Sequence, residues 1–239
     1  MDSSLARIQA ISGATLSGVL LAHLSGHALS IVSYEWANRA LLLVRPIYQH
    51  PLLEPIFAVT LATHGLASLA RVWLRKSKSK SKDKSASQGQ SAVKGTPAIV
   101  AAQREIDWHR KAGYTLAFFI SGHIFAVRLF PLYHLVDPSV MDLSMVTYSA
   151  MTYPYFFPIY YAVLGTAGLY HALYGTARVL KLKTKRGVMT WVGYGSLAVM
   201  TLTSLALSGF LYPIDMTKAP IWKEMQEDMV HSAGMGLLG

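Results

Sequence analysis

Nine histidines are the residues of this chain with the widest chemical repertoire, and most of them lie in an unusual setting. Four fall inside long apolar runs, namely His23, His64, His123 and His171. His27 follows His23 by one helical turn, and the remaining four lie in predicted loops or at helix ends: His50, His109, His134 and His231. An ionisable side chain inside a membrane is costly and usually faces a bundle interior or a functional site. The four histidines in the apolar runs are therefore predicted to face the interior of a helix bundle or a functional site.

The depth of these histidines separates them into two pairs. His64 and His171 each precede an arginine by seven residues, which places both imidazoles about 10 Å inside the same membrane face at 1.5 Å per residue. His23 and His123 lie on runs that cross in the other direction, about 23 Å from that face. Each pair therefore lies at a common depth on two different helices.

Two imidazoles that face each other at one depth are the ligand set of a six-coordinate b-type haem. The depths predict two haems, one held by His23 and His123 and the other by His64 and His171, with His27 as an alternative to His23. Three arginines near these ligands are predicted to pair with haem propionates: Arg71, Arg128 and Arg178. Neighbouring glycines are expected to admit the flat macrocycle: Gly26, Gly65, Gly122, Gly168 and Gly175. The simpler alternative is that each histidine only makes a hydrogen bond between helices.

Five apolar runs must carry these side chains across a bilayer. A hydrocarbon core of about 30 Å needs about 20 helical residues, and runs of this length cover residues 8–32, 51–73, 112–133, 155–177 and 187–214. The sequence therefore predicts an all-α membrane protein with five transmembrane helices, built as a four-helix bundle plus a fifth helix. The composition agrees, because 52% of the residues are hydrophobic, 14% are charged and the mean hydropathy is +0.33.

The charges predict the orientation and the domain organisation. Of the 22 lysines and arginines, 17 fall on the side of the N-terminus, which makes it the basic side under the positive-inside rule. One membrane domain is expected, with two helices in residues 1–75, a disordered Lys/Ser-rich loop at 76–97, three helices in 98–214 and a tail at 215–239. The loop is either a solvated linker or a binder of anionic lipid headgroups. The net charge of +10 is concentrated there and at helix ends, so no nucleic-acid partner is expected.

Other features narrow the chemistry further. The chain has no cysteine, which excludes disulfides and iron–sulfur clusters held by this chain. No Ser-His-Asp or paired-carboxylate arrangement lies within the spans, and we expect no enzymatic activity of the hydrolytic kind. The first ten residues have neither secretory-signal nor transit-peptide character, which favours insertion through internal signals. The echo of LSGH at 24–27 in ISGH at 120–123 is too short to establish a repeat.

The histidine layout resembles a known superfamily, the five-helix cytochrome b subunits of succinate dehydrogenases and fumarate reductases. A closer resemblance is to the transmembrane domain of the fungal mitochondrial outer-membrane adapter proteins tied to lipid homeostasis. It is carried by short motifs along the chain: RIQ at 7–9 with Ser12 and Gly13, YQHPLLEP at 48–55, His64 with Arg71, GYTLAFFISGHIFAVR at 113–128, and His171 with Gly175 and Arg178. The family's N-terminal extension with a proline motif has no counterpart here, because about six residues precede the first span.

The resemblance implies a non-enzymatic mitochondrial membrane protein, in the outer rather than the inner membrane, with membrane lipids and a protein at mitochondrial contact sites as partners. In the superfamily the first and third histidines bind one haem and the second and fourth bind the other, which implies the same two pairs as the depths do. The alternative function is a di-haem electron carrier that reacts with a quinone. Polar residues near the basic side are its candidate quinone contacts: Ser12, Asp107, His109 and Arg110.

Overall fold

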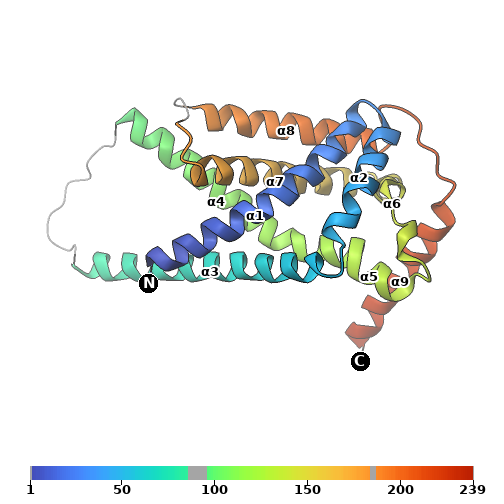
Figure 1. Ribbon diagram of the computed structural model, residues 1–239, viewed down its shortest axis with the longest axis horizontal. Coiled ribbons are helices and arrows are strands. Elements are labelled where there is room, and N and C mark those ends of the chain that lie inside the picture. Colours follow the sequence, from blue (N-terminus) through green and yellow to red (C-terminus); the bar gives the residue numbers. More distant parts are fainter. Residues whose placement is uncertain (1, 86–95, 184–186, 239) are drawn as a thin grey trace.

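The computed structural model describes residues 2–85, 96–183 and 187–238, and this part of the chain contains helices but no strand (Figure 1). The α-helices are α1 Asp2–Ala28, α2 Tyr34–Tyr48, α3 Leu53–Ser85, α4 Pro97–Ile124, α5 Phe130–His134, α6 Leu143–Thr152, α7 Phe157–Val179, α8 Val188–Leu207 and α9 Ala219–Leu238. Two 3-10 turns, η1 Leu29–Ile31 and η3 Pro138–Val140, cover parts of the connections. A π-helical turn, η2 Phe125–Leu129, joins α4 to α5 without a break.

Four segments of the described chain are long and apolar enough to cross a membrane: Ser3–Ile31, Leu53–Ser77, Ile99–His134 and Val188–Leu207. The prediction of an all-α membrane protein is therefore confirmed. The predicted count of five spans is not confirmed, since α7 is not among these segments. Tyrosines, glycines and threonines take up much of the length of α7.

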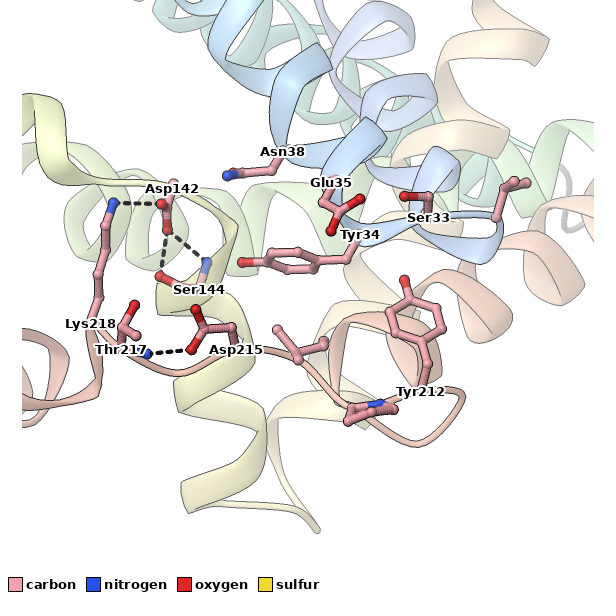
Figure 2. A pocket seen from close by; sticks show the side chains of 13 residues that line it. Ser33, Tyr34, Glu35, Asn38, Asp142, Ser144, Tyr212, Asp215, Thr217 and Lys218 are labelled. Atoms are coloured by element: carbon pink, nitrogen blue, oxygen red, sulfur yellow. Dashed lines mark hydrogen bonds and ion pairs between the residues drawn. The ribbon is translucent and has the colours of Figure 1, made fainter.

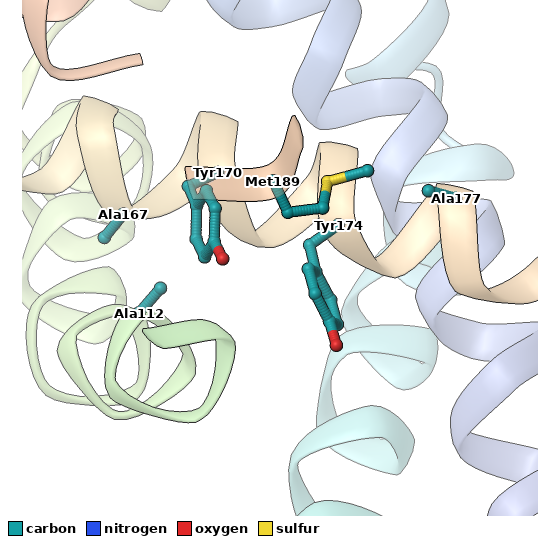
Figure 3. Packing of buried hydrophobic residues seen from close by; sticks show 6 residues of the cluster. All are labelled: Ala112, Ala167, Tyr170, Tyr174, Ala177 and Met189. Carbon is teal, nitrogen blue, oxygen red and sulfur yellow. The ribbon is translucent and has the colours of Figure 1, made fainter. Parts of the chain in front are cut away.

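Helix α7 lies at the centre of the bundle, where it packs against α1, α4 and α8 (Figure 1). Small residues allow the close approach: an added methyl group at Gly165 would come within 2.8 Å of the Met200 sulfur of α8. Figure 3 shows the apolar cluster between α4, α7 and α8, made of Ala112, Ala167, Tyr170, Tyr174, Ala177 and Met189. A helix enclosed by other helices does not need an apolar surface on every side, which accounts for the polar residues of α7.

The ends of the elements follow from their capping residues. Ser33 accepts a hydrogen bond from the backbone N–H of Trp36 and begins α2, and Asp142 accepts one from Ser144 and begins α6. Pro97 and Pro158 occupy first-turn positions of α4 and α7, where proline fits a helix without loss of a hydrogen bond. Gly187 precedes α8 with a φ of 81°, a left-handed conformation that favours glycine.

The structure extends helices into regions that the sequence analysis had treated as irregular. The connection between the first two spans contains α2, and the C-terminal segment contains α9. Helix α3 continues to Ser85, beyond residue 76 where the disordered loop was predicted to begin. Residues 86–95 of that predicted loop lie outside the described residues.

Helices α2, α5, α6 and α9 gather at the end of the bundle away from the N-terminus and form a cap there (Figure 1). We call this end the acidic side, because it lies opposite the side that the charges predict to be basic. Trp222 of α9 is fully buried in an apolar cluster of this cap with Phe130, Met141, Met145 and Met225. The Trp222 indole Nε1 donates a hydrogen bond of 2.8 Å to the Ser144 hydroxyl, so its polar edge is also satisfied. The cap therefore has a packed core of its own.

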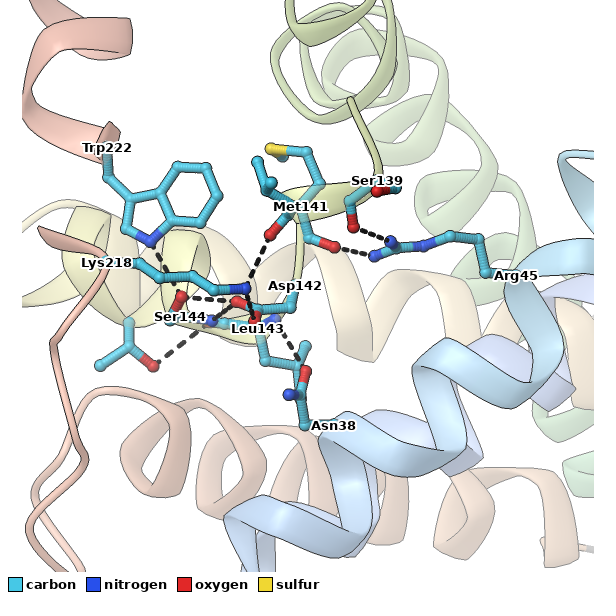
Figure 4. A network of polar contacts seen from close by, with 11 residues as sticks. Asn38, Arg45, Ser139, Met141, Asp142, Leu143, Ser144, Lys218 and Trp222 are labelled. Atoms are coloured by element: carbon cyan, nitrogen blue, oxygen red, sulfur yellow. Dashed lines mark hydrogen bonds and ion pairs between the residues drawn. The ribbon is translucent and has the colours of Figure 1, made fainter. Parts of the chain in front are cut away.

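A network of polar contacts joins the elements of the cap (Figure 4). The Lys218 ammonium lies 2.6 Å from the Asp142 carboxylate and also donates to the backbone carbonyl of Val140 at 3.0 Å. Asn38 of α2 accepts a hydrogen bond from the Leu143 N–H at 3.1 Å. Burial alone would raise the pKa of Asp142, but hydrogen bonds from Lys218 and Ser144 outweigh it and leave that pKa below its usual value.

Replacing Asp142 by asparagine should lower the stability of the cap by about 1–2 kcal/mol at neutral pH, because the charge-assisted bond to Lys218 is lost. Since folding lowers the pKa of Asp142, its contribution is present above the usual carboxyl pKa of about 4 and disappears as the pH falls through the folded-state value. Thermal unfolding in detergent at pH 7 and pH 3 measures both effects. The two proteins should differ fully at pH 7, and the difference should shrink as the pH falls below about 4, whereas Glu227→Gln in an exposed ion pair should match the wild type at both.

Candidate functional site

The structure brings six of the nine histidines together in two clusters at different depths of the bundle. The basic-side histidine cluster consists of His64, His109 and His171. The acidic-side histidine cluster consists of His23, His27 and His123. Each cluster contains one of the two pairs that the depth analysis predicted, together with one further histidine.

His64 of α3 and His171 of α7 face each other across the bundle. Their ring centroids are 6.2 Å apart, and their planes are nearly perpendicular at 88°. A metal–imidazole bond is about 2 Å long, so two imidazoles that bind one ion from opposite sides hold their centroids about 6 Å apart. The separation of His64 and His171 fits this arrangement.

The hydrogen bonds of this pair fix which ring nitrogen carries the proton. The Ser12 hydroxyl donates its one hydrogen within its own helix, with the Ile8 carbonyl at 2.7 Å, so it can only accept from His64 Nδ1 at 3.2 Å. His171 Nδ1 lies 3.3 Å from the backbone carbonyl of His109, which has no proton to give. Both Nδ1 atoms are therefore protonated, and both Nε2 atoms keep the lone pair that binds a metal. Metal-ligating histidines in proteins are held in this way.

Two glycines place the rings of this pair. An added methyl group at Gly13 of α1 would come within 2.9 Å of His64 Cε1, and one at Gly113 of α4 within 3.0 Å of His171 Cε1. Each imidazole thus packs directly on the backbone of the neighbouring helix. By contrast, Gly65 and Gly122, which the sequence analysis singled out, face open space.

His109 completes the basic-side histidine cluster. Its ring stacks on His171 with centroids 4.2 Å apart and planes inclined by 13°. It also stacks with the Tyr174 ring at a centroid distance of 4.6 Å. The Nδ1 atom of His109 is buried and has no hydrogen-bond partner in the described part of the chain. The sequence analysis had placed His109 at a helix end and had considered it only as a quinone contact.

The acidic-side histidine cluster is arranged differently. The His23 ring contacts His27 at a centroid distance of 4.3 Å and Tyr48 at 6.3 Å. His123 is close enough to interact electrostatically with both His23 and His27. The Nδ1 atom of His27 is buried without a partner among the described residues. Both His23 and His27 thus remain candidate partners of His123 for one cofactor.

The three arginines proposed to bind propionates have different surroundings. Arg128, in the π turn, forms a two-pronged ion pair with Glu54 of α3, with distances of 2.5 and 2.6 Å. Arg71 donates to the Gln9 side chain of α1. Arg178 lies near His109 and Tyr174 and is exposed. Arg178 is accordingly the arginine placed beside the basic-side histidine cluster, while Arg128 ties α3 to the end of α4.

An internal repeat, which the sequence analysis did not recognise, relates the two halves of the bundle. The pattern G-x-T-L-x6-H occurs at 13–23 in α1 and at 113–123 in α4. The pattern H-x-L-x3-A-R-V occurs at 64–72 in α3 and at 171–179 in α7. Equivalent residues have equivalent contacts, since the repeated glycine packs on the repeated histidine in both halves. The ten-residue spacing from glycine to histidine was the signal that would have found Gly13 and Gly113.

The structure contains no group of three or more histidine, aspartate or glutamate side chains arranged to hold a metal ion directly, within residues 2–85, 96–183 and 187–238. A haem needs only two axial nitrogens, and its iron is already held by the macrocycle. His64 and His171 provide these nitrogens with the right spacing and the right protonation. The residues of the basic-side histidine cluster therefore fit a haem.

Comparison with known proteins connects the second half of the chain to one family. Residues 118–234 match the family model described as MDM10-complementing protein 1, transmembrane domain. The matched stretch runs from α4 to α9 and includes His123 and His171. No curated protein and no solved structure shows significant similarity to the chain. The match supports the resemblance to the mitochondrial adapter proteins and identifies the chain as similar to a membrane domain of that kind.

Replacing Gly13 or Gly113 by alanine should destabilise the protein by about 1–3 kcal/mol, because each new methyl group forces an imidazole to move. The same replacement at Gly65 or Gly122 meets no atom within 4 Å and should be neutral or slightly stabilising, since alanine favours a helix. Thermal unfolding in detergent compares the four variants.

A double variant tests the cause of the effect. If the His64 ring is what the new methyl group meets, Gly13→Ala should cost much less in a His64→Ala background than in the wild type. Equal costs in the two backgrounds would show that the glycine serves another purpose.

Proposed function

We propose that this chain belongs to the MDM10-complementing protein family and acts as a non-enzymatic, multi-pass membrane scaffold in mitochondrial lipid homeostasis. The observation that carries this proposal is the match of residues 118–234 to the transmembrane domain of that family. The fold supports it, because the polar side chains described above either join helices to one another or belong to the two histidine clusters. The outer mitochondrial membrane is the expected location, by resemblance to the adapter proteins.

The basic-side histidine cluster is proposed to hold one b-type haem, with His64 and His171 as axial ligands. Such a haem supplies reversible one-electron chemistry when it is bound. The chain contributes the orientation of the ligands through Ser12, the His109 carbonyl and the two glycines that pack on the rings. A second haem is proposed at His123, with either His23 or His27 as the other ligand.

Helix α7 is proposed to be a fifth membrane span. It is 23 residues long, which exceeds the length needed to cross a hydrocarbon core of about 30 Å. It packs against three helices that are themselves candidate spans, so it must share their depth. Its tyrosines and glycines face protein on several sides and therefore do not oppose insertion.

A di-haem electron carrier would use the same two clusters, and the family match favours the scaffold over it. The two functions make different demands on the haem. An electron carrier loses its function when either haem is lost, whereas a scaffold needs only a folded bundle. A ligand variant that folds without haem separates them.

The haem proposal predicts the spectrum of the purified protein. His64→Ala and His171→Ala should each abolish the same low-spin haem signal, because both nitrogens bind one iron. Oxidised and dithionite-reduced absorption spectra, with a pyridine haemochrome count, measure the haem content. His231→Ala, at an exposed position of α9, is the control and should keep the full signal. A wild-type protein that folds normally without haem, even when expressed with excess haem, would contradict the proposal.

The proposal of a fifth span is tested by asking from which side of the membrane each end of α7 can be labelled. Because the chain has no cysteine, single cysteines can be introduced without a background. If α7 crosses the membrane, Tyr155→Cys and Lys181→Cys should react with an impermeant maleimide from opposite sides of intact vesicles. Thr96→Cys marks the basic side and Val136→Cys the acidic side. Labelling of positions 155 and 181 from the same side would rule out the span.

The family proposal is tested by complementation, as the name of the family suggests. Expression of the chain in cells that lack MDM10 should relieve the defect that this loss causes. A His64→Ala/His171→Ala variant should relieve it equally if the chain acts as a scaffold, and should fail if haem chemistry is required. No relief by the folded, correctly localised wild-type chain would contradict the family proposal and leave the spectral experiment unaffected.

A further inference from the structure

Helix α2 lies across the end of the bundle, whereas α3 and α8 run along it (Figure 1). It contains 15 residues and joins two candidate spans, of which one ends at Ile31 and the other begins at Leu53. The connections are short, since only residues 32–33 and 49–52 separate α2 from these spans. Both ends of α2 are therefore held where the chain leaves and re-enters the membrane, and the helix runs along this boundary.

One side of α2 is covered by the rest of the protein. Ala37 is fully buried and packs with Leu143 of α6 and Leu207 of α8. Asn38 extends toward the start of α6 (Figure 2), where it accepts a hydrogen bond of 3.1 Å from the Leu143 N–H. Arg45 donates to two backbone carbonyls of the segment before α6. This side of the helix has its partners within the chain.

A second side of α2 is charged and open. Glu35 is exposed and lines a pocket of about 600 Å³ (Figure 2). The same pocket is lined by Asp142, Asp215 and Lys218. Charged groups keep their hydration where they can, because the loss of water around them is costly. This side of α2 therefore faces water.

A third side of α2 is apolar and exposed. Trp36, Leu43 and Ile47 follow one another at intervals of seven and four residues, which places them on one face of the helix. Their exposed fractions are 59%, 77% and 58%. A helix that packs on its own protein needs a single apolar stripe, and α2 already uses Ala37 and its neighbours for that contact. An additional exposed stripe of large apolar side chains indicates a second apolar partner.

The exposed apolar face of α2 continues into the outer surface of the spans. Val32 and Leu52, in the connections at its two ends, are both exposed. Ile56 and Val59 extend this surface along the beginning of α3, which is a candidate span. The outer surface of a membrane span faces acyl chains. The same acyl chains are therefore adjacent to the exposed face of α2.

The residue types on this face suit the boundary between acyl chains and headgroups. The Trp36 indole combines a large apolar ring with one polar N–H, a combination that favours the interfacial layer. Arg39 is exposed and lies within one helical turn of both Trp36 and Leu43. Its aliphatic stem can lie along the apolar face while its guanidinium reaches the lipid phosphates.

We propose that α2 is an interfacial helix whose Trp36, Leu43 and Ile47 face inserts among the acyl chains of the acidic-side leaflet of the protein's own membrane. A helix with a protein-facing, a water-facing and an apolar side has the surfaces that such a position requires. A second copy of the chain would also bury the apolar face, but it would leave the continuity with the span surface unexplained. The inference goes beyond the proposed function and needs neither haem nor the family.

The test places a nitroxide on each side of α2 in turn. Because the chain has no cysteine, Leu43→Cys and Ile47→Cys report on the apolar face, and Glu35→Cys on the charged side of the same helix is the matched control. The full chain is reconstituted in phosphatidylcholine vesicles. Electron paramagnetic resonance then compares collisions with oxygen, which concentrates in the bilayer, and with a water-soluble nickel complex. Labels at 43 and 47 should lie about 5–10 Å below the headgroup boundary, and the label at 35 should lie on its water side.

The outcomes separate lipid from the other occupants of this face. Thermal unfolding first shows which labelled proteins are folded, and either of positions 43 and 47 is sufficient for the test. A nickel complex that reaches these positions as readily as position 35 would overturn the proposal. Immobilised labels that neither reagent reaches would also overturn it, because the face would then contact protein. Dipolar broadening that disappears on dilution with unlabelled chain would identify that protein as a second copy.

Discussion

The close packing of α7 against three neighbouring helices is the constraint on which the rest of the structure depends. Only small residues allow it, as the contact between Gly165 and Met200 shows. Because the helix is enclosed, it can carry the tyrosines and the histidine that a lipid-facing span would exclude. His171 and its partners can therefore lie in the middle of the bundle rather than at its surface.

The repeat organises the histidines around this central helix. In each half, a glycine of the first helix supports an imidazole of the second, and the hydrogen bond to Nδ1 differs only in its acceptor, a serine hydroxyl in one half and a backbone carbonyl in the other. The halves are not equivalent in their packing, because α1 packs on α7 whereas α3 and α4 share no comparable contact in the described chain. The Glu54–Arg128 ion pair joins α3 to the α4 end of the bundle instead.

Much of the bundle could be predicted from the sequence, because long apolar runs and the depth of a histidine along a helix are both linear properties of the chain. The pair His64 and His171 followed from depth alone. What depth cannot give is the rotation of each helix about its axis, and for that reason the roles of Gly13, Gly113 and His109 were missed. The cap was missed for another reason: Trp222 is buried by contacts with residues some 80 positions away along the chain.

The π turn at Phe125–Leu129 has a consequence for how the third span should be read. A uniform α-helix advances about 100° per residue, and one widened turn shifts the phase of everything that follows it. His123, just before the turn, interacts with His23 and His27 of α1, whereas Phe130, just after it, packs into the apolar cluster around Trp222. A single helical wheel drawn through this span would superimpose two surfaces that serve different neighbours. The continuous helix thus behaves as two segments with separate orientations, coupled by five residues.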